Sequence, residues 1–279
     1  MKRYNAIALA ISLLCAGLVA LPAAAQDPAV LAADAAFLQA AGKADKVALA
    51  RLLDASFSWT DMAGKTRSGA QVAQAMPKLL IGDESKADIK RYSYGEVAVV
   101  RAASGQMHVL RVWVKRPAGW RALVYQEVKL LDAPPTATPG AGNDCANPCK
   151  SLPFQPKTEN DRAVASAYMA LESSVMAHDA EKWASLIGDE FAALSSNSNK
   201  LLDKATRKSE LARSSLAGLA PTPLSSARMS DFGDAVVMES EHQPDRGKPL
   251  HVTRVWVKRG AGWVETVSYQ TSIQAAAGR

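Results

Sequence analysis

The 279-residue chain lacks most of the short motifs by which enzymes can be recognised from sequence. It contains no Gly-rich phosphate loop, no G-x-S-x-G nucleophile elbow and no H-E-x-x-H pattern. None of its four histidines stands at a metal-ligand spacing, and its cysteines have no other ligand residues nearby. These absences exclude the usual phosphate-loop, hydrolase and zinc-protease signatures, and we predict neither a metal nor a cofactor.

The sequence also lacks a dense basic region. Its formal net charge is +6, and removal of a leader containing Lys2 and Arg3 lowers this to +4. The nearest approach to a basic patch comprises Lys200, Lys204, Arg207 and Lys208, a pattern more typical of a solvated loop. We therefore predict no nucleic-acid partner.

Only one long apolar run is present, from Ala6 to Leu21, and it is short for a membrane span. It follows Lys2 and Arg3 and precedes Ala23-Ala24-Ala25, which has the form of an A-x-A cleavage site. The alternative is an uncleaved N-terminal anchor. We interpret residues 1–25 as a signal peptide and expect an exported protein, periplasmic or secreted, with no stable membrane insertion after cleavage.

Cysteine is almost absent from the expected mature chain, which retains only Cys145 and Cys149. In an oxidising compartment a small-loop disulfide is the simplest expectation, because the spacing is not that of a C-x-x-C redox motif. The pair lies in residues 132–157, which hold six of the fourteen prolines. We interpret this segment as an extended, semi-rigid linker.

A long internal repeat is the main positive feature of the sequence. Residues 108–120 read HVLRVWVKRPAGW, and residues 251–263 read HVTRVWVKRGAGW, with eleven of the thirteen positions identical. Such a repeat indicates a duplicated domain. We predict one domain over residues 26–131 and a second over residues 158–279.

Each half follows the same predicted order of elements. The first half is expected to contain two helices, a strand, a third helix and an antiparallel meander, with the second helix over residues 45–54 and the third over 68–80. The repeat locates insertions in the second half at Ser195–Arg207 and Gln243–Lys248. It also aligns Tyr125-Gln126 with Tyr269-Gln270, which predicts one extra residue, and so a β-bulge, in the last strand.

Three segments carry a family resemblance. They are residues 52–61 (LLDASFSWTD) with Gly64-Lys65 behind them, residues 94–99 (YGEVAV), and residues 111–115 (RVWVK) turning at Gly119-Trp120 and ending in Tyr125-Gln126. With these motifs each half resembles the nuclear transport factor 2-like superfamily, specifically its DUF4440 and SnoaL-like groups. The second half matches the first segment only in part. The resemblance implies an α+β fold in which a curved antiparallel sheet and three helices enclose a pocket, forming a cone. Such domains commonly pair through the outer faces of their sheets, so we expect an intramolecular pseudo-dimer.

Relatives with this fold use pocket carboxylates and tyrosines for proton transfer, which makes Asp61, His108 and Tyr125 the catalytic candidates. The wider set of ligand-binding candidates is Trp59, Asp61, His108, Arg111, Trp113, Tyr125, Gln126, His251, Arg254, Trp256, Tyr269 and Gln270. An Asp before a Gly turn is more often a turn residue than a base, and a strand histidine is more often structural. Strand alternation places His108 and Arg111 on opposite faces. Trp113 and Trp256 either line the pockets or are buried where the halves meet.

We expect a non-catalytic protein that binds a small apolar or amphipathic ligand, or a protein partner through its sheet faces. The alternative is a cofactor-independent isomerase, dehydratase or cyclase acting by proton transfer. Because Asp61 occurs only in the first half, any active site is predicted there, with the second half as a scaffold. Further homo-oligomerisation is left open.

Overall fold

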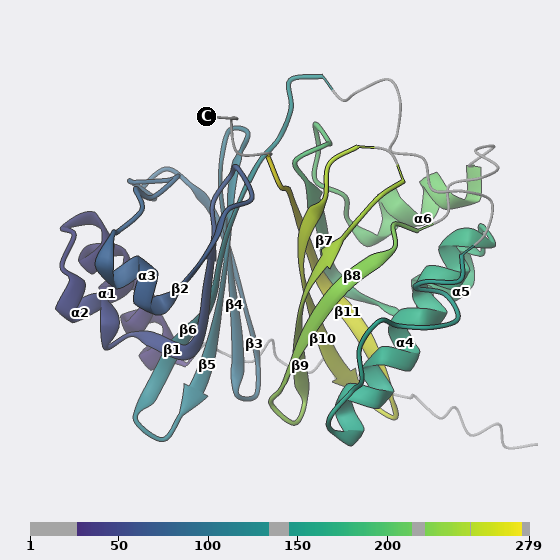
Figure 1. The fold of residues 1–279 in the computed structure, drawn as a ribbon, viewed down its shortest axis with the longest axis horizontal. Coiled ribbons are helices and arrows are strands. Elements are labelled where there is room, and N and C mark those ends of the chain that lie inside the picture. The colour runs from purple at the N-terminus through teal and green to yellow at the C-terminus, as the bar shows by residue number, and fades with distance from the viewer. Residues whose placement is uncertain (1–26, 134–144, 214–220, 246, 275–279) are drawn as a thin grey trace, which may run out of the picture.

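The computed structural model describes residues 27–133, 145–213, 221–245 and 247–274. The predicted signal peptide and residues 134–144 of the predicted linker lie outside the described residues. The two halves stand side by side with their sheets facing each other at the centre and their helices on the two outer sides (Figure 1). Among the described residues, no helix is long and apolar enough to span a membrane.

The first half, domain 1, begins with three short helices interleaved with two strands and continues as a four-stranded meander. Its elements are α1 (Pro28–Gly42), α2 (Lys46–Ala50), β1 (Leu53–Thr60), β2 (Thr66–Ser68), α3 (Gly69–Gln74), β3 (Asp88–Tyr94), β4 (Val97–Ser104), β5 (Met107–Arg116) and β6 (Gly119–Lys129). Asp27 caps α1, and Ser68 and Gln71 form the predicted capping box of α3. Helix α3 ends earlier than the sequence predicted, since Pro77 follows and disfavours helical backbone before it.

The second half, domain 2, repeats this plan with longer first and third helices. Its elements are α4 (Glu159–Met176), α5 (Ala180–Ser185), β7 (Ile187–Ser195), α6 (Lys204–Arg213), β8 (Leu224–Asp231), β9 (Ala235–His242), β10 (Leu250–Arg259) and β11 (Gly262–Ser272). The predicted insertion after Ser195 forms a loop and leads into α6. A single bridge between Ala193 and Leu202 stands where domain 1 has β2.

The two sheets have matching topologies. Their strand orders are β2-β1-β6-β5-β4-β3 and β7-β11-β10-β9-β8. Neighbouring strands are antiparallel except that β1 lies parallel to β6, and β7 parallel to β11. Each sheet is therefore mixed, and the parallel pair places the first strand of each half beside the last one.

The outer faces of the two sheets are buried against each other. One continuous apolar cluster takes Val97, Leu110 and Val112 from domain 1 and Val237, Val255 and Val267 from domain 2. Across it, the Arg116 guanidinium lies 5.1 Å from the Phe232 ring centre, and Arg259 lies 5.5 Å from the ring centre of Tyr94. These reciprocal contacts between equivalent positions are the mark of an isologous interface. The halves form the expected intramolecular pseudo-dimer.

The prediction of an extra residue in the last strand is wrong. Both β5–β6 and β10–β11 contain the register shift, at Val112/Trp113 and Val255/Trp256. Arg111 stands opposite Tyr125, whereas its counterpart Arg254 stands opposite Ser268. The structural counterpart of Tyr125 is thus Ser268, and Tyr269 points to the other face of the sheet.

Candidate functional site

Aromatic side chains fill the cone of domain 1, the region between its sheet and its helices. Trp59 of β1 stacks on Tyr125 of β6 with ring centres 3.8 Å apart, and Phe37 of α1 contacts both rings. Trp113 closes the group with an edge contact to Phe37. All four side chains are buried. Three predicted site residues, Trp59, Trp113 and Tyr125, therefore form a solid core.

Arg111 is also inside the cone of domain 1, where two acidic side chains neutralise it. Its Nε and Nη2 atoms donate to Asp34 at 2.7 and 2.9 Å, and Nη2 also donates to Glu84 at 2.9 Å. Asp34 accepts a further hydrogen bond from Trp113 Nε1 at 2.9 Å. A hollow on the surface reaches Asp34 and Glu84, but both carboxylates are already paired with Arg111.

The other candidates of domain 1 lie outside the cone or at its base. Asp61 accepts turn hydrogen bonds from the backbone of Ala63 and Lys65 and pairs with Arg67 at 2.7 Å. His108 is buried on the face that meets domain 2, and burial lowers its pKa. Gln126 donates to Tyr269 O at 3.1 Å and Thr271 Oγ1 at 2.9 Å across the interface. These residues have structural roles, so the prediction of an active site in the first half loses its geometric basis.

The cone of domain 2 contains a cavity of about 520 Å³. Its apolar wall includes Leu171, Val175, Trp183, Phe191 and Leu250, and its polar wall includes Glu172, Ser268, Gln270, Arg254 and Glu265. The inserted loop and α6 complete the lining with Asn197, Ser198, Asn199, Lys200, Leu202, Arg207 and Glu210. A cavity of this size suits a small organic ligand.

Two exchanges of large for small side chains open this cavity. Trp59 pairs in register with Tyr125, and the equivalent residues Ala193 and Ser268 pair in the same way in domain 2. Both small residues line the cavity. Because the backbone register is the same in both halves, the space that two stacked rings fill in domain 1 is left open in domain 2.

A charged group lies on the polar wall of the cavity. Arg254 Nε is 3.3 Å from Glu265 Oε1, and its Nη2 donates to Glu172 Oε1 at 3.4 Å. Burial is the main cause that raises the pKa of Glu265, to about 8, and it also raises the pKa of Glu172, although Arg254 opposes both shifts. Glu265 Oε1 has no hydrogen-bond partner among the described residues.

His242 supports this group from β9. Its Nδ1 lies 3.0 Å from the carbonyl oxygen of Thr222 and therefore carries the proton, which leaves Nε2 to accept from Arg254 Nη1 at 3.2 Å. Burial and the neighbouring Arg254 lower the pKa of His242 to about 3. The imidazole is thus neutral and holds the guanidinium in place.

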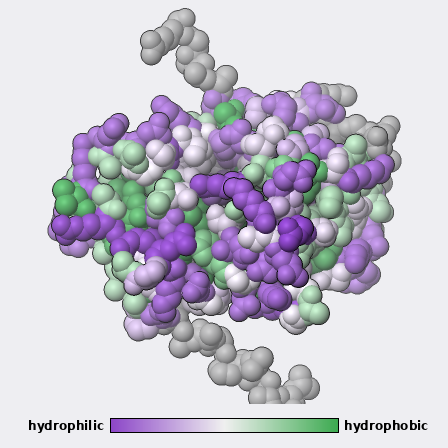
Figure 2. All heavy atoms as spheres, turned by 60° about the horizontal axis from the view of Figure 1, so that its bottom comes forward, coloured by the Kyte–Doolittle hydropathy of each residue, from purple (hydrophilic) through white to green (hydrophobic). Residues whose placement is uncertain are grey.

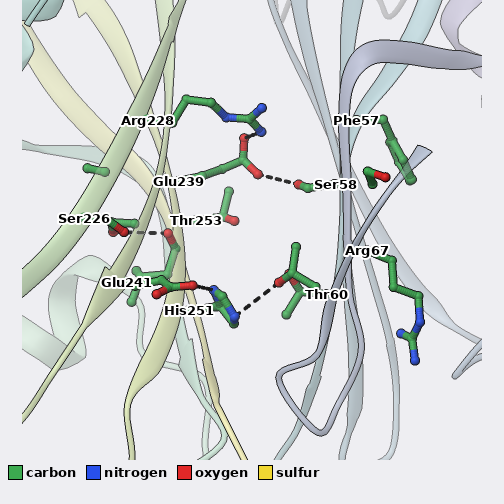
Figure 3. Close-up of a pocket in the computed structure, with 15 residues that line it drawn as sticks. Phe57, Ser58, Thr60, Arg67, Ser226, Arg228, Glu239, Glu241, His251 and Thr253 are labelled. Carbon is green, nitrogen blue, oxygen red and sulfur yellow. Dashed lines mark hydrogen bonds and ion pairs between the residues drawn. The ribbon is translucent and has the colours of Figure 1, made fainter. Parts of the chain in front are cut away.

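A second hollow, of about 460 Å³, lies between the halves and is shown in Figure 3. Glu239 accepts hydrogen bonds from Ser58 of β1 and from Arg228 of β8. His251 Nε2 lies 3.2 Å from Thr66 Oγ1 of β2, and His251 Nδ1 lies 3.5 Å from Glu241. The side chains that project into this groove are mostly polar and are hydrogen-bonded to one another, and these bonds connect the two halves.

Of the candidates predicted in domain 2, Arg254 and Gln270 line the cavity. Trp256 is buried behind it, edge-on to Tyr168, and Tyr269 belongs to the interface between the halves. The sequence analysis missed Glu172, Glu265, His242 and Ser268. An alignment of the halves in the correct register would have shown a carboxylate at 265 where domain 1 has Ala122. Among the described residues, no group of three His, Cys, Asp or Glu side chains could hold a metal.

The fold of each half follows from its strand order and the position of its helices. A twisted sheet carries three helices on its inner face, and its outer face pairs with the other half. Each half has the fold that the resemblance to nuclear transport factor 2-like domains implies. No protein-family model and no curated protein matches the chain, so assignment to the DUF4440 or SnoaL-like groups stays a prediction.

Solved structures of nuclear transport factor 2-like proteins align with part of the chain. A protein from Cytophaga hutchinsonii is 16% identical over 42% of this chain and 100% of its own, with a TM-score of 0.31. One from Rhodospirillum rubrum, titled as of unknown function in nutrient uptake, is 21% identical over 39% of this chain and 98% of its own, with a TM-score of 0.32. The calmodulin-dependent kinase II hub homology domain of Chlamydomonas reinhardtii is 16% identical over 42% of this chain and 100% of its own, with a TM-score of 0.34.

Proposed function

We propose that the chain binds a small amphipathic molecule in the cone of domain 2. The cavity left by Ala193 and Ser268 is the observation that supports this proposal. One wall of the cavity is apolar and the rest is polar or charged, so the cavity suits a molecule with an apolar and a polar part. Domain 1, whose cone is filled, stabilises domain 2 through the shared interface.

The alternative of a protein partner bound through the sheet faces has less support. The outer faces are already buried between the two halves. Exposed large apolar side chains among the described residues are scattered: Leu31, Val47, Met62, Leu131 and Leu201. The face drawn in Figure 2 is mostly hydrophilic, with hydrophobic residues in small groups. Surfaces of this kind are normal for a protein without a large docking site.

The test uses N-phenyl-1-naphthylamine, a neutral dye that fluoresces when it enters an apolar pocket. We expect saturable binding to the wild-type protein and its loss in the double variant Ala193→Trp/Ser268→Tyr, which refills the cavity. Ala55→Trp/Ser56→Tyr is the matched control, because it adds the same side chains at exposed positions of β1. Equal binding by the cavity-filling variant and the wild type would refute the proposal.

A proton-transfer activity is a second candidate function, with its site in domain 2 and not in domain 1 as the sequence suggested. Glu265 is buried at the cavity wall with an unbonded oxygen and a pKa raised to about 8, as a general acid or base requires. Exchange of the α-hydrogens of 2-octanone with D₂O, followed by NMR, measures such an activity. It should be lost in Glu265→Gln, and no exchange above the rate in buffer alone would count against it.

We also propose that the chain is exported and that Cys145 and Cys149 form a disulfide. The support is the leader-like sequence of residues 1–25 and the Cα–Cα distance of 5.4 Å between the cysteines, which suits a disulfide. N-terminal sequencing of protein from the periplasm or medium should begin at Gln26, and alkylation without a reductant should leave both cysteines unmodified. An intact N-terminus or two alkylated thiols would contradict these expectations.

A further inference from the structure

The two equivalent arginines differ in how closely carboxylates hold them. Arg111 donates to Asp34 and Glu84 at 2.7–2.9 Å, the usual range of charged hydrogen bonds. The carboxylate oxygens nearest to Arg254 lie at 3.3 and 3.4 Å, on Glu265 and Glu172. The guanidinium of Arg254 is buried in a cavity wall and is held by its two carboxylates at longer distances than Arg111 is.

One replacement explains this difference. Asp34 of α1 corresponds to Tyr168 of α4, as Val30 corresponds to Val164 at the same spacing. The Arg254 guanidinium lies 4.9 Å from the centre of the Tyr168 ring. With its face on this ring, the guanidinium donates from its edge to His242 and Glu172 and still lines the cavity. Trp256 Nε1 also lacks a partner among the described residues, whereas the equivalent Trp113 donates to Asp34.

The charge balance of the cavity favours an anionic ligand. Arginine keeps its charge when buried, whereas a buried carboxyl group can take up a proton. Burial raises the pKa of Glu265 to about 8, which favours its neutral form near pH 7, and burial also raises the pKa of Glu172. At the mouth, Lys200 and Arg207 share the single carboxylate of Glu210, at 2.7 and 3.5 Å.

We propose that the ligand of domain 2 is an amphipathic carboxylate whose head group pairs with Arg254 and whose apolar part packs against Trp183, Phe191 and Leu171. The guanidinium fork matches the planar carboxylate. A protonated Glu265 donates a hydrogen bond to the same head group, and the apolar wall opposite accepts the chain. This inference rests on the proposed binding function and specifies its ligand class.

Three probes with the same eight-carbon chain separate the head group from the tail. Octanoate, 1-octanol and octylammonium are titrated separately against the full-length protein loaded with N-phenyl-1-naphthylamine. We expect octanoate to displace the dye at concentrations about 10- to 100-fold lower than the other two, as one buried charged hydrogen-bond pair provides.

Arg254→Gln should remove this preference for octanoate while leaving displacement by 1-octanol unchanged. Arg259→Gln is the matched control, because it makes the same change on the same strand at an exposed position. The control should keep the preference for octanoate.

A pH series tests the inference without touching the arginine. Besides Arg254, the ionisable groups around Glu265 are Tyr168 and Glu172 of α4, Arg207 and Glu210 of α6, Lys200 of the inserted loop and His242 of β9. Octanoate affinity should fall between pH 6 and pH 9 as Glu265 ionises, by about 10-fold, and Glu265→Gln should flatten this dependence.

The outcomes separate the two proposals. If none of the three probes displaces the dye and the dye itself does not bind, the binding function fails. If 1-octanol or octylammonium binds as tightly as octanoate, or if octanoate affinity does not change with pH in the wild type, the cavity is still a binding site and the carboxylate inference is wrong.

Discussion

Arg111 and Arg254 show how a single neighbouring residue sets the role of a duplicated side chain. Each arginine stands at the same register position of its sheet, beside an equivalent buried tryptophan. In domain 1, Asp34 fixes both side chains and completes a closed core. In domain 2, Tyr168 replaces that carboxylate, and Glu172 and Glu265 approach Arg254 from the cavity side. The same segment of the repeat therefore holds a structural arginine in domain 1 and, in our proposal, a ligand-binding arginine in domain 2.

Glu265 provides a prediction at the residue scale. Its pKa is raised from the ordinary 4.5 to about 8 by burial, so the folded state keeps a proton that the unfolded chain releases. The contribution to stability is fully present below pH 4.5 and is lost as the pH rises through 8, at up to about 1.4 kcal/mol per pH unit. The Glu265→Gln variant should not show this loss of stability with rising pH, because glutamine does not ionise.

Urea unfolding of both proteins between pH 5 and pH 9 measures the effect. We expect Glu265→Gln to gain stability relative to the wild type as the pH rises toward 8. Parallel pH profiles for the two proteins would show that Glu265 is ionised in the folded protein.

At the scale of elements, one exchange between the equivalent strands β1 and β7, Trp59 for Ala193, separates a filled cone from an open one. Trp59 projects from β1 into the cone and is fully buried against Tyr125, whereas Ala193 projects from β7 into open space. The loop inserted after Ser195 then covers the opening with polar side chains. One strand completes a core, and its duplicate forms the wall of a site.

Exchanging the two side chains should change stability by different amounts in the two strands. Trp59→Ala should lower the free energy of unfolding by about 3–5 kcal/mol, because it leaves a cavity in a filled core. Ala193→Trp should cost less than about 1 kcal/mol, since the cavity of about 520 Å³ has room for the ring. Urea denaturation of the two variants checks the contrast, and similar losses would contradict the difference between the two cones.

The internal repeat indicated two domains, and the family resemblance implied the fold, the three helices of each half and the paired outer faces. Side chains of a strand alternate between two faces, so the two faces of residues 108–115 (HVLRVWVK) could be assigned from the period alone. The open cavity could not be predicted in this way. The identical Tyr-Gln pairs at Tyr125 and Tyr269 favoured an alignment one residue out of register. That alignment matched Tyr125 with Tyr269 in place of its true counterpart, Ser268. Glu172 was missed because its contact with Arg254 joins positions 82 residues apart.

At the scale of the whole molecule, we expect the two halves to fold and unfold as one unit, because they share an apolar interface. The interface joins the outer faces of both sheets in one apolar cluster, and Gln126 extends it with hydrogen bonds to the Tyr269 carbonyl and the Thr271 hydroxyl of β11. We therefore expect the stability of domain 2, with its open cavity, to depend on the interface behind its sheet.

Val112→Asp tests this dependence. The change places an unpaired charge in the centre of the interface, and we expect a loss of about 3–5 kcal/mol that affects both halves together. Val47→Asp, the same substitution at an exposed position of α2, should change stability by less than about 0.5 kcal/mol. If limited proteolysis of the Val112→Asp protein degraded domain 1 and left domain 2 intact, the halves would not be a single unit.

The central claim, that the ligand site lies in the cone of domain 2, has a direct spectroscopic test. The chain has six tryptophans: Trp59, Trp113 and Trp120 in domain 1, and Trp183, Trp256 and Trp263 in domain 2. In protein labelled with 5-fluorotryptophan, each gives a ¹⁹F resonance that single Trp→Phe variants assign. Titration with octanoate should shift the Trp183 resonance most, because that ring lines the cavity, and leave the three of domain 1 unchanged. A shift confined to Trp59 or Trp113 would place the ligand in domain 1 and contradict the account.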